Sequence, residues 1–180
     1  MPSITHAYIG LGSNLGDRAG NLLLALRGML DSGVRVARLS SVYETEPVGV
    51  QTAQPLFLNM VAELALDAGT ANASPSPEQL LARLLRIEYA LGRRRDAPLA
   101  PRTIDLDLLL YGDARAQTEY LTLPHPRLHL RRFVLAPLCE LAPRALHPTL
   151  RQSFAALLSE LSDASKVERW TPAGERGGFV

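Results

Sequence analysis

The apolar residues of this chain recur with two periods, one typical of strands and one typical of helices. Alternating or continuous apolar runs predict strands at residues 6–11, 34–43, 57–66 and 101–112. Leucines at helical spacing predict one helix between Asp17 and Gly33 and a second between Ser76 and Gly92. Two shorter helices are predicted at 132–141 and 153–161. The order strand, helix, strand, strand, helix, strand predicts an α+β fold with a mostly antiparallel sheet of the split βαβ type and helices packed on it.

The start of the second long helix has the strongest local signal. Ser76 stands at the N-cap position, Pro77 at the first helical position and Gln79 where a capping box needs an amide or acid. No internal repeat and no domain boundary interrupt the pattern. We therefore expect one domain at 1–165, followed by a polar, glycine-rich tail at 166–180.

Composition narrows the class of protein. The chain has 180 residues, of which 47% are hydrophobic and 21% charged, as is typical of one globular domain. Its 19 basic and 18 acidic residues give a net charge of +1, which does not favour non-specific nucleic-acid binding. The one cysteine, Cys139, excludes an internal disulfide and lies in an apolar run, so we expect it in the core. No signal peptide and no apolar run of membrane-spanning length is visible, and a cytoplasmic protein without a membrane partner is expected.

The run PRTIDLDLLLYG at 101–112 carries the clearest chemistry. Asp105 and Asp107 are two residues apart, so on a strand their carboxylates point to the same face and repel each other. A hard divalent cation with oxygen ligands would relieve that repulsion, and Mg²⁺ commonly reaches proteins together with phosphates. Arg102 and the cluster at 93–95 suit phosphate, so the residues indicate a phosphoryl-transfer site. Two simpler interpretations stay open: a solvated sheet face for the aspartates, and an exposed helix end for the arginines.

Four motifs in order make the chain resemble the 6-hydroxymethyl-7,8-dihydropterin pyrophosphokinase family. The resemblance runs from Ala7 to about Pro148. The motifs are GSNLG at 12–16, YETEPVG at 43–49 with FLN at 57–59, PRTIDLD at 101–107, and LPHPR at 123–127 with Arg131 and Phe133. Any one of them would be weak, whereas all four at these separations are specific.

The resemblance implies a ferredoxin-like domain that transfers diphosphate from ATP to the pterin hydroxymethyl group and releases AMP. Asp105 and Asp107 would hold two Mg²⁺ ions, and Arg95 and Arg102 would join them as catalytic residues. Catalysis would then depend mainly on alignment and electrostatics, without a covalent intermediate. ATP and the pterin are the expected small-molecule partners, and a monomer is expected.

The resemblance also implies two sets of contacts. Stacking between Phe57 and Phe133, and the donor and acceptor of Asn59, would hold the flat pterin. The full pterin set is Gly12, Ser13, Thr45, Pro47, Val48, Phe57, Asn59 and Phe133. The ATP set is Leu85, Glu88, Arg93, Arg95, Arg102, Leu108, Leu121, Thr122, His125 and Arg131. The loop at 93–100 would close over ATP as a lid.

This chain departs from the family pattern in the lid. Pro98, Leu99 and Ala100 stand where family members often carry Arg-Trp-Gly, and Leu85 stands where some have glutamine. A pterin- or nucleotide-binding relic whose lid does not close therefore remains an alternative, as does a nucleotidyltransferase, because such palms also pair aspartates on a sheet. Without the resemblance, Phe57 and Phe133 would be ordinary core aromatics. The glycines at 10, 12 and 16 do not fit a dinucleotide-binding fingerprint.

Overall fold

A computed structural model describes residues 4–50, 52–67, 74–94 and 99–172 of the chain. The described residues form eight strands, four α-helices and one 3₁₀ turn. In chain order they are β1 (Ile4–Ser13), α1 (Arg18–Asp31), β2 (Arg35–Leu39), β3 (Tyr43–Thr45), β4 (Phe57–Asp67), α2 (Pro77–Ala90), β5 (Asp105–Tyr111), β6 (Ala116–Gln117), β7 (Thr122–Leu123), the 3₁₀ turn η1 (Leu128–Leu130), α3 (Arg132–Leu141), α4 (Phe154–Glu160) and β8 (Val167–Arg169).

The main sheet has the strand order β5-β1-β4-β3-β8, and β2 pairs with the same edge of β4 as β3 does. All of these pairings are antiparallel. If β2 and β3 are counted as one interrupted strand, the chain order is βαββαβ and the last strand lies beside the first, as in ferredoxin-like folds. The predicted α+β architecture is confirmed.

Three predicted boundaries differ from the structure. The strand expected at 34–43 is split, because the Ser40 hydroxyl accepts a hydrogen bond from the Val61 N–H (2.9 Å) where a regular ladder would use a backbone carbonyl. The strand expected to begin at 101 begins at Asp105. The expected tail is partly structured: β8 pairs with β3, and the Trp170 N–H donates to the Val42 carbonyl (2.9 Å). A three-residue polar edge strand is too short to produce a period in the sequence.

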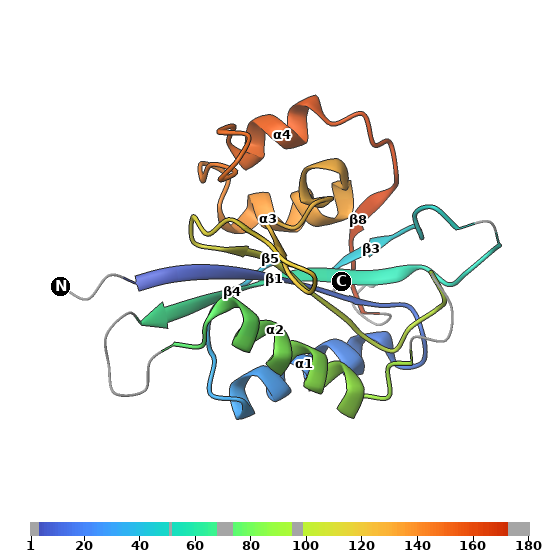
Figure 1. The fold of residues 1–180 in the computed structure, drawn as a ribbon. Coiled ribbons are helices and arrows are strands. Elements are labelled where there is room, and N and C mark those ends of the chain that lie inside the picture. The colour runs from blue at the N-terminus through green and yellow to red at the C-terminus, as the bar shows by residue number, and fades with distance from the viewer. Residues whose placement is uncertain (1–3, 51, 68–73, 95–98, 173–180) are drawn as a thin grey trace, which may run out of the picture.

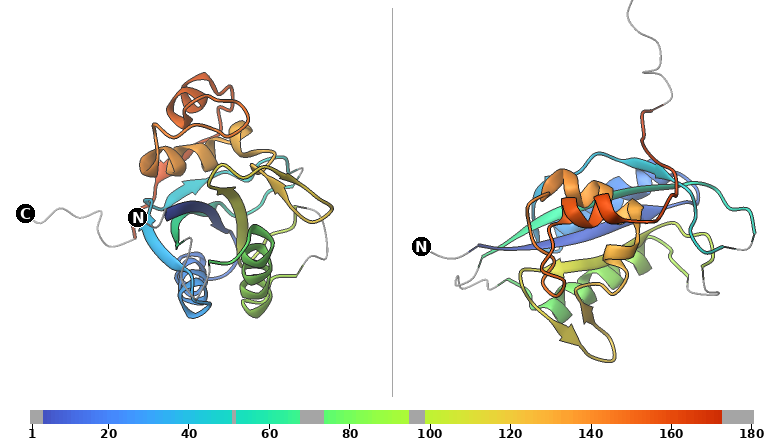
Figure 2. Two further views of the ribbon diagram at one scale, coloured as in Figure 1. Left: turned by 60° about the vertical axis from the view of Figure 1, so that its left-hand side comes forward. Right: turned by 90° about the horizontal axis from the view of Figure 1, so that it is seen from above.

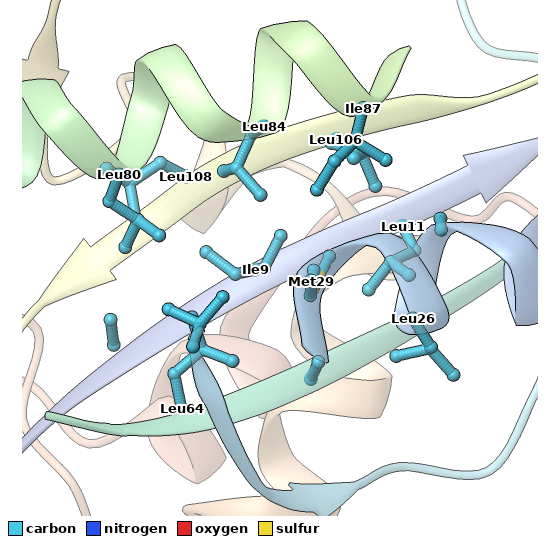
Figure 3. Packing of buried hydrophobic residues seen from close by; sticks show 14 of the residues in the cluster. Ile9, Leu11, Leu26, Met29, Leu64, Leu80, Leu84, Ile87, Leu106 and Leu108 are labelled. Carbon is cyan, nitrogen blue, oxygen red and sulfur yellow. The ribbon is translucent and has the colours of Figure 1, made fainter. Parts of the chain in front are cut away.

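Helices cover both faces of the sheet. Figure 1 shows α1 and α2 below it and α3 and α4 above it, and the end-on view in Figure 2 shows the same three layers. On the α1/α2 side, Ile9 and Leu11 of β1 pack with Met29 of α1 and Leu84 of α2, as Figure 3 shows. None of the described helices is long and apolar enough to cross a membrane.

The helix starts follow the capping signals in the sequence. Asp17 caps α1 by accepting a hydrogen bond from the Gly20 N–H (3.0 Å). At α2, the Ser76 hydroxyl accepts from the Gln79 N–H, and the Gln79 side chain accepts from the Ser76 N–H, so the predicted capping box is confirmed. These caps fix where each helix begins under the sheet, and thereby which faces of the strands stay free for a site.

Candidate active site

The floor of the candidate site is built by three neighbouring strands on the sheet face toward α3. Asp105 of β5 lies opposite Gly12 of β1, which in turn lies opposite Asn59 of β4. Two residues further along β5, Asp107 lies opposite Gly10 of β1. Two inter-strand spacings separate the aspartates from Asn59, or about 10 Å. Because both β1 positions facing the aspartates are glycines, β1 itself places no side chain over this part of the floor.

A cavity of about 690 Å³ lies over this floor. Ten of the predicted site residues line it, from β1, the loops before β4 and β5, the start of α3, and the strands themselves. They are Gly12, Val48, Phe57, Asn59, Arg93, Arg102, Asp105, Asp107, Arg131 and Phe133. The structure therefore brings the predicted aspartates, arginines and aromatic rings together in one cavity.

The two aspartates differ in their partners. Arg93 contacts Asp105 Oδ1 (2.6 Å) and Arg102 contacts Asp105 Oδ2 (2.8 Å), so both oxygens of that carboxylate are paired with guanidinium groups. The Asp107 carboxylate makes no hydrogen bond or ion pair with any described residue. Burial, followed by the negative charge of Asp105, raises the pKa of Asp107 from 3.8 to about 6. The carboxylate of Asp105 is thus balanced by two guanidinium groups, whereas that of Asp107 has no ion-pair partner.

The arginines of the cavity also fall into two groups. Arg93 and Arg102 are paired with Asp105, whereas Arg94, Arg127 and Arg131 make no side-chain hydrogen bond or ion pair within the described part of the chain. Burial and then the positive charge of Arg127 lower the pKa of Arg131. Such unpaired, mutually repelling cations around a cavity are suited to a polyanion.

The two aromatic rings of the cavity each lie beside a cation. The Arg102 guanidinium lies 5.6 Å from the centre of the Phe57 ring, and the Arg131 guanidinium lies 5.4 Å from that of Phe133. Each aromatic ring therefore lies at the border between the apolar and the cationic side chains of the cavity. A flat ring bound against Phe57 or Phe133 would lie next to whatever anion the arginines hold.

The amide of Asn59 is oriented by a buried hydrogen bond. Its Nδ2 donates to Thr45 Oγ1 (2.7 Å), and both residues are buried. Its Oδ1 then lies over the floor, since a Cβ atom added to Gly12 would approach it to 2.6 Å. The orientation leaves an acceptor of Asn59 directed toward the cavity.

Asp105 and Asp107, which lie side by side on one face of β5, are suited to binding a hard cation. No cluster of three or more His, Cys, Asp or Glu that could hold a metal by itself occurs in the described residues. Asp107 nonetheless presents a carboxylate without a partner, beside Asp105 on the same strand face. Mg²⁺ takes one or two carboxylates and fills its remaining positions with water and phosphate oxygens, which is the donor set that this cavity offers.

Comparison with known proteins identifies the family of this chain. The family model described as 7,8-dihydro-6-hydroxymethylpterin-pyrophosphokinase (HPPK) matches residues 8–143. This chain belongs to the HPPK family. It is 45% identical over 136 residues to the 2-amino-4-hydroxy-6-hydroxymethyldihydropteridine pyrophosphokinase of Bacillus subtilis, covering 75% of this chain and 77% of that protein. It is 41% identical over 169 residues to the enzyme of the same name from Methylorubrum extorquens, covering 92% and 99%.

Some HPPK relatives are much longer proteins. The chain is 44% identical over 138 residues to the "Folate synthesis bifunctional protein, mitochondrial" of Pisum sativum, covering 77% of this chain and 25% of that protein. Among solved structures, it resembles a Plasmodium falciparum HPPK-DHPS with a TM-score of 0.64 and 14% identity, over 88% of this chain and 45% of that one. The chain thus spans less than half of that solved chain, and at this identity the likeness shows the fold alone.

Several residues that the HPPK resemblance assigns to ligands lie outside the cavity wall. Ser13 is buried on the α1 side of the sheet, where its hydroxyl accepts from Asn21 Nδ2 (3.3 Å). Thr45 is buried beside Asn59, and Pro47 lies in the loop after β3. Leu108 and Leu121 belong to the core on the α1/α2 side. Leu85 lies on the outer surface of α2, and Arg95 lies outside the described residues.

Glu88, assigned to ATP by the same resemblance, lies beneath the site. Its Oε1 accepts a hydrogen bond from the Leu106 N–H (2.8 Å), and its Oε2 is 3.7 Å from Arg93 Nε. It is buried between α2 and β5. In the ligand-free structure, Glu88 therefore positions the strand that carries the aspartates and the arginine that contacts Asp105.

Thr122 and His125 line a second, adjacent cavity of about 420 Å³ between β7 and the loop after α3. Burial, followed by the charges of Arg131 and Arg127, lowers the pKa of His125 to about 4. His125 is therefore neutral at physiological pH in the ligand-free protein. The arginines that lower its pKa belong to the larger cavity, so the two cavities meet at this segment.

Asn14, in the motif at 12–16, has a structural role that the sequence pattern does not predict. The Asn14 side-chain oxygen accepts from the Arg102 N–H (2.8 Å), and the Asn14 N–H donates to the Arg102 carbonyl (3.1 Å). Its side-chain amide contacts Gln54 and the Pro55 carbonyl, each at 3.3 Å. Asn14 thereby joins the segment before β5 to the loop before β4. Arg127 also lines the cavity without having been assigned a role.

Proposed function

We propose that the protein transfers the terminal diphosphate of ATP to the hydroxymethyl group of 6-hydroxymethyl-7,8-dihydropterin, giving AMP and the pterin diphosphate. The observation that carries this proposal is the row of Asp105, Gly12 and Asn59, which joins a carboxylate end and an amide-and-aromatic end within one cavity. Membership of the HPPK family and the names of its relatives support the same activity.

The pterin is proposed to bind at the Asn59 end. Asn59 Oδ1 is directed over the floor, where it would accept a hydrogen bond from an N–H at the edge of the pterin ring. The Phe57 ring passes over Gly12, with Phe57 Cδ1 3.6 Å from a Cβ added there, and so provides an aromatic face beside the amide. Phe133 at the start of α3 provides the second aromatic wall.

The triphosphate is proposed to bind at the aspartate end, between the arginines. Asp105 and Asp107 would hold Mg²⁺, with two ions as the family resemblance implies, and the metal would absorb negative charge on the phosphates during transfer. Arg93 and Arg102 now occupy both oxygens of Asp105. Binding of Mg²⁺ and the triphosphate therefore requires that these guanidinium groups leave the Asp105 carboxylate and pair with phosphate oxygens. A planar guanidinium can pair with two oxygens of a phosphate as well as with two oxygens of a carboxylate.

The reaction itself needs alignment more than covalent help. The pterin hydroxyl oxygen forms a bond to the β-phosphorus, the bond from that phosphorus to the α–β bridging oxygen breaks, and AMP leaves with that oxygen and its electron pair. The hydroxyl proton is released to solvent. The arginines, and a metal held by the carboxylates, would keep the attacking and leaving oxygens in line and stabilise the negative charge that the transfer redistributes.

The test is a product assay with ATP, Mg²⁺ and hydroxymethyl-dihydropterin. AMP and the pterin diphosphate in equal amounts support the proposal, whereas release of pyrophosphate would indicate a nucleotidyltransferase. Binding of both ligands without any AMP would indicate a relic that cannot complete its closed site. The Asp107→Ala variant should lose turnover while its affinity for the pterin stays near the wild-type value.

A further inference from the structure

Arg127 is the cavity arginine to which neither the motifs nor the comparisons give a role. It lines the same cavity as Asp105, Asp107 and Phe133. We propose that Arg127 is a binding residue for the phosphate groups of the nucleotide. This inference rests on the proposed function, because it takes the nucleotide of that reaction as the ligand.

The backbone holds Arg127 in a defined position. The Arg127 N–H donates to His125 Nδ1 (3.2 Å), and the next residue, Leu128, donates its N–H to the His125 carbonyl (3.0 Å). Leu128 is fully buried in the core on the α3 side. Arg127 thus stands between a hydrogen-bonded turn and a buried anchor, and its long side chain extends from a fixed base into the cavity.

No anion of the described chain pairs with the Arg127 guanidinium. It makes no side-chain hydrogen bond or ion pair with any described residue. Of the two carboxylates in this cavity, Asp105 pairs both oxygens with Arg93 and Arg102, and Asp107 forms no ion pair with Arg127. Arg127 is exposed to solvent at the cavity, so its guanidinium is free to pair with an anion that binds there.

The charge of Arg127 acts on its neighbours in an unfavourable way while the site is empty. After burial, it is the largest influence that lowers the pKa of Arg131, and it also helps to lower that of His125. Arg127 and Arg131 therefore repel each other, and an anion placed between them relieves that repulsion. The density of charge suits a polyanion better than a single carboxylate.

The phosphates, and not the pterin, provide that anion. The pterin alcohol carries no anionic group, whereas the triphosphate presents several oxygens that a guanidinium fork can pair in twos. Arg127 also comes from the segment between β7 and α3, whereas Arg93 and Arg102 come from the segment between α2 and β5. The nucleotide phosphates would then be held by two segments of the chain.

The experiment compares Arg127→Gln with Arg144→Gln. Arg144 is exposed in the loop after α3, lines neither described cavity, and makes no side-chain hydrogen bond or ion pair with the described residues, so its variant removes the same charge elsewhere. Kd is measured by calorimetry for a non-hydrolysable ATP analogue with Mg²⁺ and for adenosine. Arg127→Gln should weaken binding of the analogue about tenfold and leave adenosine unchanged, while Arg127→Lys should lose about threefold because it keeps the charge without the fork.

Two results would overturn the inference. One is a loss for the ATP analogue no larger with Arg127→Gln than with Arg144→Gln, which would reduce the effect to net charge. The other is an equal loss for adenosine, which would indicate a damaged fold. The outcome is separate from that of the product assay: a chain that forms no AMP but shows the phosphate-specific loss refutes the proposed function alone, and an active chain without that loss refutes the role of Arg127 alone.

Discussion

Replacing Asp107 by asparagine is expected to stabilise the ligand-free protein at neutral pH, although it removes a residue of the proposed active site. Burial and the charge of Asp105 raise the pKa of Asp107 from 3.8 to about 6. A shift of about 2 units corresponds to about 3 kcal/mol between the two protonation states. Because the two carboxylates titrate as an interacting pair, this is the upper limit for Asp107 alone, and a gain of about 1 to 3 kcal/mol is expected.

The sign follows from comparing the folded and unfolded chains. The folded protein binds the Asp107 proton more tightly than the unfolded chain does, so this group favours folding below about pH 4, and that contribution is lost as the pH rises through about 6. Above pH 6 the ionised carboxylate costs stability. An amide of the same shape cannot ionise, so Asp107→Asn should gain most at pH 7.5 and little at pH 4.5.

The assay is thermal unfolding in EDTA without nucleotide, at pH 7.5 and pH 4.5. For a chain of 180 residues, a gain of 1 to 3 kcal/mol raises Tm by about 2 to 10 °C. Asp113→Asn, in the exposed turn after β5, is the matched control and should not raise Tm. An Asp107→Asn protein that is no more stable than wild type at pH 7.5, or a gain of equal size at both pH values, would refute the reasoning. AMP formation by this variant should be abolished, which would make Asp107 a residue kept for function at a cost in stability.

Three further variants test other parts of the structure. Gly12→Ala should raise KM for the pterin about tenfold, because the new Cβ would lie 2.6 Å from Asn59 Oδ1. Gly10→Ala is the control, since its Cβ meets Leu109 at 3.5 Å and it should bind the pterin almost normally. Equal KM values for the two variants would contradict the floor geometry. Arg102→Lys should lower kcat/KM more than tenfold in steady-state kinetics with both substrates. The Arg102 guanidinium contacts Asp105 and the Ala100 carbonyl and lies over Phe57, and one ammonium group cannot make all three contacts. A loss of kcat/KM under twofold would count against this role. A chain that ends at residue 165 should melt about 4 to 8 °C lower, because it lacks β8 and the packing of Trp170 on the core; an unchanged Tm by circular dichroism would mean that the segment contributes nothing.

The parts of the fold that could be predicted are those with a local cause. The caps of α1 and α2 were predicted because Asp17, Ser76 and Gln79 satisfy backbone N–H groups within a few residues of themselves. The shared direction of Asp105 and Asp107 follows from the period of a strand alone. The antiparallel architecture followed from element order, which limits how strands can be connected.

The parts that could not be predicted depend on contacts between distant segments. Asn14 and Arg102 are joined by two hydrogen bonds, yet 88 positions separate them, and no period or cap indicates the pair. The pairing of β8 with β3 is of the same kind. That Gly10 and Gly12 lie opposite the two aspartates depends on the register between β1 and β5, which includes an irregularity after Tyr8 and cannot be counted from either strand alone.

If the proposed function holds, the difference between Asp105 and Asp107 predicts that the metal and the nucleotide phosphates bind together. A cation that approached Asp105 alone would have to displace two guanidinium groups and leave them without partners in a cavity that already contains unpaired arginines. A phosphate that approached alone would attract those arginines away from Asp105 and leave two neighbouring carboxylates uncompensated. When metal and phosphate arrive together, every charge that is released finds an opposite charge, so the arrangement of Asp105, Asp107 and the arginines favours the metal–nucleotide complex over either component by itself.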